Sequence, residues 1–121
     1  MNRESLIEYF INIFPEYRSA LKQHLEDYDE VLMHVFFGDT VNERLIELLE
    51  FDEGNNKELQ KLFNFLEKMA LEGDLDVQEV LAVTILERLG DDKSLLENAY
   101  KYMGENTKVA SKEIEGFWGR M

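Results

Sequence analysis

Apolar residues recur along most of the chain at intervals of three and four positions, the spacing that places them on one face of an α-helix. The first such segment runs from about Asn2 to Phe14, and Pro15 is suited both to end it and to open the next helix. The apolar face of the first helix consists of Leu6, Ile7, Phe10, Ile11 and Phe14. That of the second consists of Tyr17, Ala20, Leu21, His24, Leu25 and Tyr28. Both helices are predicted to pack one side against a core.

The stretch 29–38 permits two interpretations. Its apolar residues have helical spacing, yet valine and phenylalanine favour β geometry, so the stretch equally fits a short extended connection. Gly38 is typical of a helix end. Thr40 followed by Glu43 fits a capping box, in which each side chain satisfies a free backbone amide at the helix start. A helix is therefore predicted from Thr40 to about Phe51.

Four further helices are predicted after Gly54. Their expected capping residues are Asn55 with Glu58, Asp76 with Glu79, Asp91 or Asp92, and Asn106 or Thr107. The first three of these helices are expected to end at Gly73, at about Leu89 before Gly90, and at Gly104. The helix after Asp76 is apolar on most sides, which is typical of a central helix. The expected inner face of the last helix is Val109, Ala110, Ile114, Phe117 and Trp118, and the pattern leaves open whether Trp118 is instead an exposed contact.

These patterns give six or seven short helices joined by tight glycine turns. Sequential helices with short connections tend to pack antiparallel. We therefore predict an all-α fold whose helices stack as antiparallel helical hairpins, either HEAT-like or as a compact multi-helix bundle. No linker-like composition divides the chain, so residues 1–121 are predicted to form a single all-helical domain.

The chain of 121 residues carries 26 acidic and 13 basic residues, a formal net charge of −13. A field of that sign repels phosphates and attracts basic proteins, so we expect a basic protein partner and no nucleic acid. The absence of cysteine excludes disulfides and thiolate metal sites and fits a reducing cytoplasm. Glu4 and Glu8 interrupt the apolar residues at the start, so no signal peptide is expected. No apolar run approaches the roughly 20 residues that span a bilayer, and a cytoplasmic protein is predicted.

The sequence contains no motif for catalysis or cofactor binding. Two acidic clusters contain an Asp-x-Asp step, but a calcium loop also needs glycine at its sixth position. Loops beginning at Asp27 and Asp74 have Leu32 and Glu79 there. No serine lies in a G-x-S-x-G elbow, and no phosphate-binding glycine loop occurs. We therefore predict a protein that is not an enzyme and that holds neither a metal nor a cofactor.

The two histidines, His24 and His34, lack the spacing of a zinc site. His24 lies on the apolar stripe of its helix, so we interpret it as a hydrogen-bonded core residue. His34 adjoins the turn predicted before Gly38. Its ring is expected to hold that turn through a backbone carbonyl or to line a small pocket, and the structural role is favoured.

A stripe of like charges is the most informative surface feature of the sequence. Asp39, Glu43, Glu47 and Glu50 follow one another at steps of four, four and three residues, which puts them side by side on one helix. Like charges at this spacing cost a few tenths of a kcal/mol per pair, and those near the helix end also oppose the helix dipole. The stripe is either an ordinary solvated face or a docking face for a cationic protein. A second acidic patch consists of Glu26, Asp27, Asp29 and Glu30.

The segments HVFFGD at 34–39, LGDD at 89–92 and EGFWG at 115–119 carry a resemblance to a known type of protein. With these segments, the whole chain resembles a family of small, acidic, all-helical bacterial proteins of unknown function. Residues 77–103 are also similar in texture to HEAT-type helical repeats. Members of such families are often encoded beside secreted polymorphic toxins, so the resemblance implies an immunity protein, without any catalytic residue to carry over.

Our leading hypothesis is a cytoplasmic immunity protein that neutralises a basic bacterial toxin through its two acidic surfaces. The first alternative is a general helical scaffold or adaptor that binds a cellular protein or peptide in a groove, through exposed aromatic and methionine side chains. The second is a small metal-dependent hydrolase that uses the acidic clusters and His34.

Overall fold

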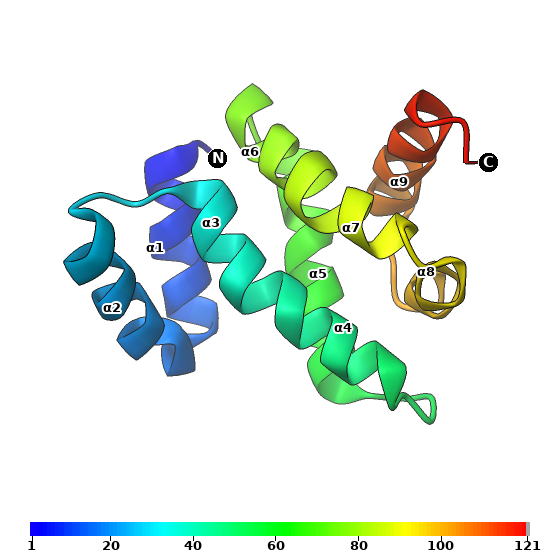
Figure 1. The fold of residues 1–121 in the computed structure, drawn as a ribbon, viewed down its shortest axis with the longest axis horizontal. Helices are drawn as coiled ribbons and strands as arrows, with labels where there is room; N and C mark the ends of the chain where they lie inside the picture. Colours follow the sequence, from blue (N-terminus) through cyan, green and yellow to red (C-terminus); the bar gives the residue numbers. More distant parts are fainter. Residues whose placement is uncertain (121) are drawn as a thin grey trace.

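The computed structural model describes residues 1–120 and confirms the all-α prediction. Helices take up 80% of the chain, and the part described contains seven continuous helices and no strand. Figure 1 shows them in chain order from the N-terminal pair to the C-terminal pair at the opposite end. None of the helices described is long and apolar enough to cross a membrane.

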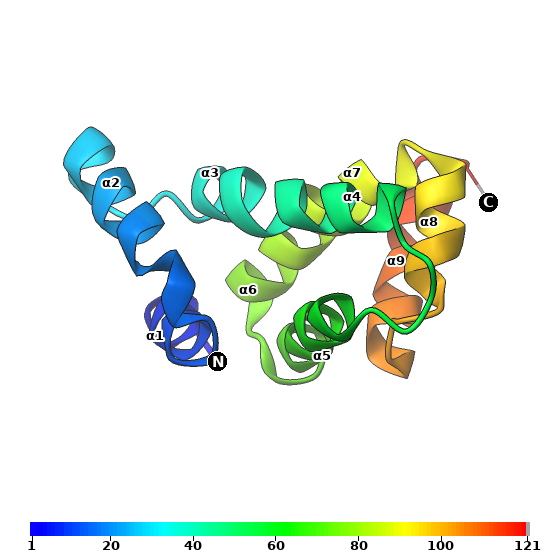
Figure 2. The ribbon, with the colours of Figure 1, turned by 90° about the horizontal axis from the view of Figure 1, so that it is seen from below.

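Two of the seven helices are composite, because each contains a π-helical segment between two α-helical ones. The elements are α1 (Arg3–Ile13), η1 (Pro15–Tyr17), α2 (Arg18–Tyr28), α3 (Met33–Phe37), η2 (Gly38–Asn42), α4 (Glu43–Glu50), α5 (Lys57–Glu72), α6 (Leu75–Glu79), η3 (Val80–Leu86), α7 (Glu87–Gly90), α8 (Lys93–Tyr100) and α9 (Glu105–Phe117). The π segments are η2, between α3 and α4, and η3, between α6 and α7. Figure 2 shows α3 and α4 in line along one side of the molecule, with α1 and α5 on the other.

The N-terminal helices have nearly the predicted bounds, but the apolar face of α2 is less buried than predicted, with Leu25 41% and Tyr28 46% exposed. Asn2 caps α1 through a capping box with Ser5, and Pro15 opens the short 3₁₀ turn that leads into α2. The histidine of the second stripe, His24, is 6% exposed, and its Nε2 atom accepts a hydrogen bond from the backbone amide of Leu32 at 2.9 Å. Its predicted role as a hydrogen-bonded core residue is therefore confirmed.

The predicted helix end at Gly38 is wrong, and so is the capping box that was expected to follow it. Gly38 has helical dihedral angles, φ −65° and ψ −42°, and the helix continues through it from Met33 to Glu50. The Thr40 hydroxyl donates to the carbonyl of Phe36 at 2.7 Å instead of capping a helix start. The apolar face continues across the glycine, so burial of its neighbours favours a continuous helix over the local tendency to stop.

Gly38 lies where a second helix approaches. A Cβ atom there would lie 3.0 Å from the guanidinium of Arg88 on α7, which is the end of a flexible, exposed side chain and can move aside. The two π segments η2 and η3 also contact each other, so the two composite helices meet at the place where both are widened. The Nδ1 atom of His34 and the Oγ1 atom of Thr84 form a hydrogen bond between the same two helices.

Two of the predicted caps are displaced by one or two residues. Asn56, not Asn55, caps α5 by accepting from the Leu59 amide, because Asn55 adopts a left-handed conformation in the preceding turn. Asp74, not Asp76, caps the helix that follows it. Asp92 caps α8 as predicted, and α9 begins at Glu105, ahead of the expected start at Asn106 or Thr107.

The core is one apolar cluster that draws on residues from Leu6 to Met103. Its aromatic centre is Phe10, whose ring centroid lies between 5.2 and 6.0 Å from those of five other rings. These rings belong to Phe14, Tyr17, Phe36, Phe37 and Phe65. Aromatic pairs at such distances stabilise a core beyond their buried area. The N-terminal helices are therefore held against the middle of the chain, and the surfaces described next lie on this frame.

Candidate protein-binding surfaces

The predicted acidic stripe lies on the first composite helix of the chain, which consists of α3, η2 and α4. Asp39 is in η2, whereas Glu43, Glu47 and Glu50 are in α4, and all four side chains are exposed. Asp39 does not stand at a helix start, because α3 precedes it, so the helix dipole does not stabilise its carboxylate. Because the π turn between Asp39 and Glu43 is wider than an α turn, the carboxylate of Asp39 does not continue the α-helical spacing of the other three.

Arg44 partly neutralises the stripe but points mainly away from it. Its guanidinium donates two hydrogen bonds to Glu58 on α5, at 2.7 and 2.8 Å, and one to Glu47 at 3.0 Å. The hydrogen bond from Arg44 holds the pKa of Glu58 below its ordinary value, although burial opposes this. Among the residues described, Asp39, Glu43 and Glu50 form no ion pair.

The second acidic patch lies elsewhere. Glu26 and Asp27 are in the last turn of α2, and Asp29 and Glu30 follow in the connection to α3, all of them exposed. In Figure 1 this connection lies at the far end of the molecule from the end of α4. The structure therefore keeps the two predicted acidic surfaces apart, so that a compact partner would meet one of them at a time.

Helix α9 buries polar side chains, which the sequence prediction missed. Thr107 and Ser111 are fully buried, and Glu115 is 4% exposed. The spacing of four residues places them on one face of the helix. Each has a hydrogen-bonding partner: Thr107 bonds to Glu67, Ser111 to Tyr100, and Glu115 to Arg120. Because all three polar groups are satisfied, the helix can pack this face inward without a large desolvation cost.

The apolar side of α9 consequently faces outward. Val109 is 56% exposed and Phe117 76%, so the prediction that these two residues face the core is wrong. Trp118, for which both alternatives were open, is 52% exposed. The rings of Phe117 and Trp118 meet edge to face, with centroids 5.3 Å apart. Clusters of large apolar side chains on a protein surface mark interaction sites more often than isolated ones do.

A groove of about 470 Å³ runs along this apolar side of α9. The α9 residues that line it are Asn106, Val109, Ala110, Glu113, Ile114 and Phe117, which form one continuous helical stripe. The opposite wall comes from the end of α5 and from α6 and η3, and consists of Ala70, Leu75, Gln78, Glu79, Leu81 and Ala82. Leu75 is 87% exposed, the largest value among the big apolar side chains described.

The charges that line the groove are of one sign. Glu79 and Glu113 contribute a carboxylate from each wall, and no lysine, arginine or histidine is among the residues that line it. The groove thus combines apolar walls with an acidic rim. This combination can bind an apolar side chain that is flanked by cationic ones, through burial and electrostatic complementarity together.

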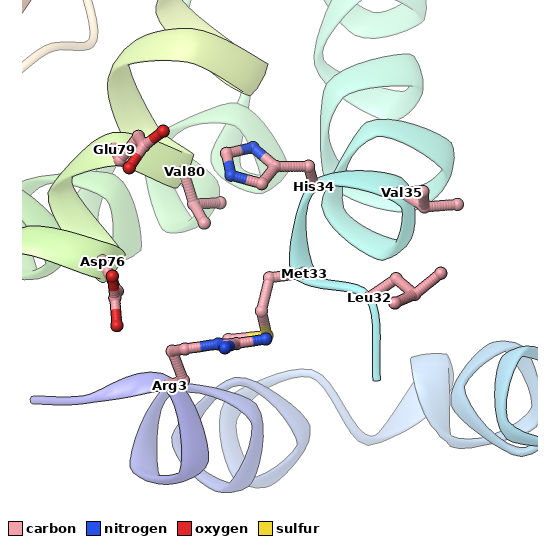
Figure 3. Close-up of a pocket in the computed structure, with 8 residues that line it drawn as sticks. All are labelled: Arg3, Leu32, Met33, His34, Val35, Asp76, Glu79 and Val80. Carbon is pink, nitrogen blue, oxygen red and sulfur yellow. The ribbon is translucent and has the colours of Figure 1, made fainter. Parts of the chain in front are cut away.

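His34 lines a smaller pocket of about 360 Å³, shown in Figure 3. Its ring binds the hydroxyl of Thr84 rather than a backbone carbonyl, while its place beside a pocket agrees with the second expectation for it. In Figure 3, the labelled residues around this pocket come from three helices, with Arg3 on α1, Met33 on α3 and Asp76 on α6. Within residues 1–120, no group of three or more histidine, aspartate and glutamate side chains is placed to hold a metal ion.

The fold and these surfaces define an all-helical domain that has an apolar groove and separate acidic faces. Residues 7–119 match the family described as Domain of unknown function (DUF7674), and the chain belongs to that family. No curated protein and no solved structure matches the chain.

Proposed function

We propose that this protein is a non-enzymatic protein-binding domain that takes a basic partner. The observation that carries the proposal is the groove along α9, with exposed Leu75 and Phe117 on its walls and Glu79 and Glu113 at its rim. Binding energy in protein complexes comes mostly from apolar anchors in such depressions, whereas rim charges contribute specificity and association rate.

The shape of the groove favours a helical segment as its occupant. Helix α9 has 13 residues, which corresponds to a length of about 20 Å at about 1.5 Å per residue. An amphipathic helix that lies in a groove presents anchors at positions i, i+3, i+4 and i+7 to the groove walls. Lysine or arginine beside these anchors would meet Glu79 and Glu113.

The acidic faces supply long-range attraction in this proposal. A chain with a net charge of −13 attracts cations from every side, and Glu43, Glu47 and Glu50 concentrate that field on α4. Such fields raise association rates by 10-fold to about 1,000-fold at low ionic strength. The patch around Asp27 and Asp29 adds a second region of the same sign at the other end of the molecule.

As a biological role we propose a bacterial, cytoplasmic immunity protein whose basic partner is a toxin domain. Two features support it: the strongly acidic surface and the resemblance to acidic helical proteins that are encoded beside secreted toxins. A toxin that binds in the groove and against an acidic face would have its active site or its substrate path covered. Fast association from charge and slow dissociation from apolar anchors are the kinetics that such a role requires.

A general scaffold or adaptor is the second candidate, and the exposure of the groove's apolar walls favours it. Such a protein would bind its peptide through Leu75, Val109 and Phe117, with little help from charge. Salt separates the two candidates, because screening at high ionic strength weakens electrostatic association strongly and apolar contacts little.

The test is affinity capture from lysate of the native organism, and from cells that express candidate toxins, followed by elution with salt. A basic protein that is retained by the wild type, lost with Phe117→Ser and released at high salt supports the proposal. Phe51→Ser is the matched control, because Phe51 is 79% exposed but lies outside the groove. A partner that is retained equally by all three proteins would contradict the groove assignment.

The role of the acidic stripe is tested by association kinetics with the captured partner. Reversing Glu43 and Glu47 to lysine is expected to slow association markedly at low salt. The control reverses Glu4 and Glu8 on α1, which are also exposed and change the net charge equally. An effect of the same size from both pairs would show that net charge, rather than the face of α4, attracts the partner.

A further inference from the structure

A second groove, on the other side of α9, has the opposite charge. It lies between α8 and α9, has a volume of about 700 Å³ and is the largest of the hollows described here. The residues that line it are Gly90, Asp91, Lys93, Leu96, Glu97, Tyr100, Lys108, Lys112, Glu115 and Arg120. They include four cations and three carboxylates, in a chain whose 26 acidic residues outnumber its 13 basic ones.

The carboxylates of this groove are largely engaged by one cation. Arg120 donates to Glu115 at 2.6 Å and to Asp91 at 2.8 Å, and also to the backbone carbonyl of Glu87 at 3.1 Å. Its guanidinium is therefore held by four hydrogen bonds to protein acceptors, of the five that it can donate. This network leaves Glu97 as the remaining carboxylate of the lining.

The three lysines have no such partners. Among the residues described, Lys93, Lys108 and Lys112 form neither an ion pair nor a hydrogen bond through their ammonium groups. Lys108 and Lys112 are one helical turn apart on α9, and Lys93 is the first residue of α8. All three cations line the same hollow without a carboxylate partner, so each of them can attract an anion that binds there.

The surface between the lysines is mostly apolar. Leu96 is 7% exposed and the ring of Tyr100 lies beside it in the lining, with its hydroxyl 3.3 Å from the Oγ atom of Ser111. A volume of about 700 Å³ falls within the range of about 300–1,000 Å³ that is typical of small-molecule sites, which combine an apolar surface with a few polar groups.

We propose that the groove between α8 and α9 binds a small anionic amphiphile, a molecule with a carboxylate, sulfonate or phosphate on an apolar body. The ammonium groups of Lys93, Lys108 and Lys112 bind the anionic group, and Leu96 and Tyr100 contact the apolar body. The site is independent of the protein-binding groove, because the two grooves have no lining residue in common.

Decanoate is a suitable probe, with decanol as the neutral analogue and acetate as the head group alone. We expect calorimetric binding of decanoate but not of decanol or acetate, with amide NMR shifts confined to α8 and α9. Lys108→Ala combined with Lys112→Ala is expected to weaken binding by about tenfold, the equivalent of about 1.4 kcal/mol. Lys22→Ala combined with Lys57→Ala removes the same charge elsewhere on the exposed surface and should leave the affinity unchanged.

The other outcomes would overturn this assignment. Equal binding of decanoate and decanol, or equal weakening by both lysine pairs, would show that the groove does not recognise the anion. Binding of an acidic peptide or of phosphatidylglycerol vesicles, without binding of decanoate, would indicate a macromolecular ligand instead. Phe117→Ser should leave decanoate binding intact, so a failure of the protein-binding groove and a failure of this site are distinguishable.

Discussion

Glu67, in the middle of α5, serves as the N-terminal cap of α9 through Thr107. Its Oε1 atom accepts hydrogen bonds from the backbone amide and from the hydroxyl of Thr107, both at 2.8 Å. Its Oε2 atom accepts from the backbone amide and the side-chain amide of Asn106, at 3.1 and 2.8 Å. One carboxylate therefore satisfies two backbone amides at the start of a helix that it does not belong to.

Replacing Glu67 by alanine is expected to destabilise the fold by about 1–3 kcal/mol, because amides and the buried Thr107 hydroxyl lose their acceptor. The measurement is the free energy of unfolding in denaturant. Glu72→Ala on the same helix is a control, since its exposed side chain makes a surface ion pair with Lys68. A loss no larger for Glu67→Ala than for Glu72→Ala would contradict the capping role.

The same contact predicts a dependence of stability on pH. Burial raises the pKa of Glu67, but hydrogen bonds from Asn106 and Thr107 outweigh it and hold the pKa below its ordinary value. A carboxyl whose pKa is lower in the folded state stabilises the fold above its unfolded pKa of about 4.3. That contribution should disappear as the pH falls through the folded pKa. The difference between wild type and Glu67→Gln should therefore shrink in acid, and a difference that grows would refute the linkage.

Gly90→Ala is expected to destabilise the protein by about 1–3 kcal/mol, although alanine normally stabilises a helical position relative to glycine. Gly90 is buried at the end of α7, and a Cβ atom there would overlap the carboxylate of Glu115 and the guanidinium of Arg120. Thermal unfolding of the variant checks the sign. If this overlap is the cause, Gly90→Ala should cost less in a protein that already carries Glu115→Ala than it costs in the wild type.

Asn42→Leu is expected to stabilise the protein by about 1 kcal/mol. Asn42 is 2% exposed, and its Oδ1 atom lacks a hydrogen-bonding partner within the part of the chain that the structure describes. A buried carbonyl without a donor is costly, and an apolar side chain of similar volume removes that cost. A midpoint of denaturation below that of the wild type would show that the amide has a partner in solution.

Phe117→Ser is expected to change the free energy of unfolding by less than about 0.5 kcal/mol, because its ring is 76% exposed. Phe63→Ala, at a fully buried ring, should cost about 3–5 kcal/mol. Denaturant unfolding of both variants measures the contrast. A cost above about 2 kcal/mol for Phe117→Ser would mean that the groove wall is needed for folding rather than available for a partner.

The sequence predicted those parts of the fold in which one periodic apolar stripe faces the core. The stripe from Leu6 to Phe14 and the cap at Asp92 are examples, and the count of six or seven helices agrees with the structure. The helix end predicted at Gly38 is wrong because burial of Phe37 and Val41, on either side of the glycine, favours a continuous helix. Phe37 packs against Phe10, 27 positions earlier in the chain, and no local pattern reveals that contact.

The orientation predicted for α9 is wrong because the helix carries two periodic faces, one apolar and one polar, and the prediction places the apolar face in the core. A signal was present in the sequence: Thr107, Ser111 and Glu115 recur at intervals of four residues. Their burial depends on hydrogen-bonding partners that lie outside α9, and Arg120, just beyond its end, is one of them. The groove exists because α9 buries its polar face and exposes its apolar one, so the local pattern is least informative at the candidate site.

The π segments have a consequence for how the length of this chain can vary. A π turn holds about one residue more than an α turn, so removing one residue from η2 can convert it to an ordinary α turn. Helix α4 would then keep nearly its present orientation relative to α3, and Phe36 and Phe37, which precede η2, would keep their places in the core. A single-residue deletion there can therefore be absorbed locally, without re-aiming the carboxylates of α4.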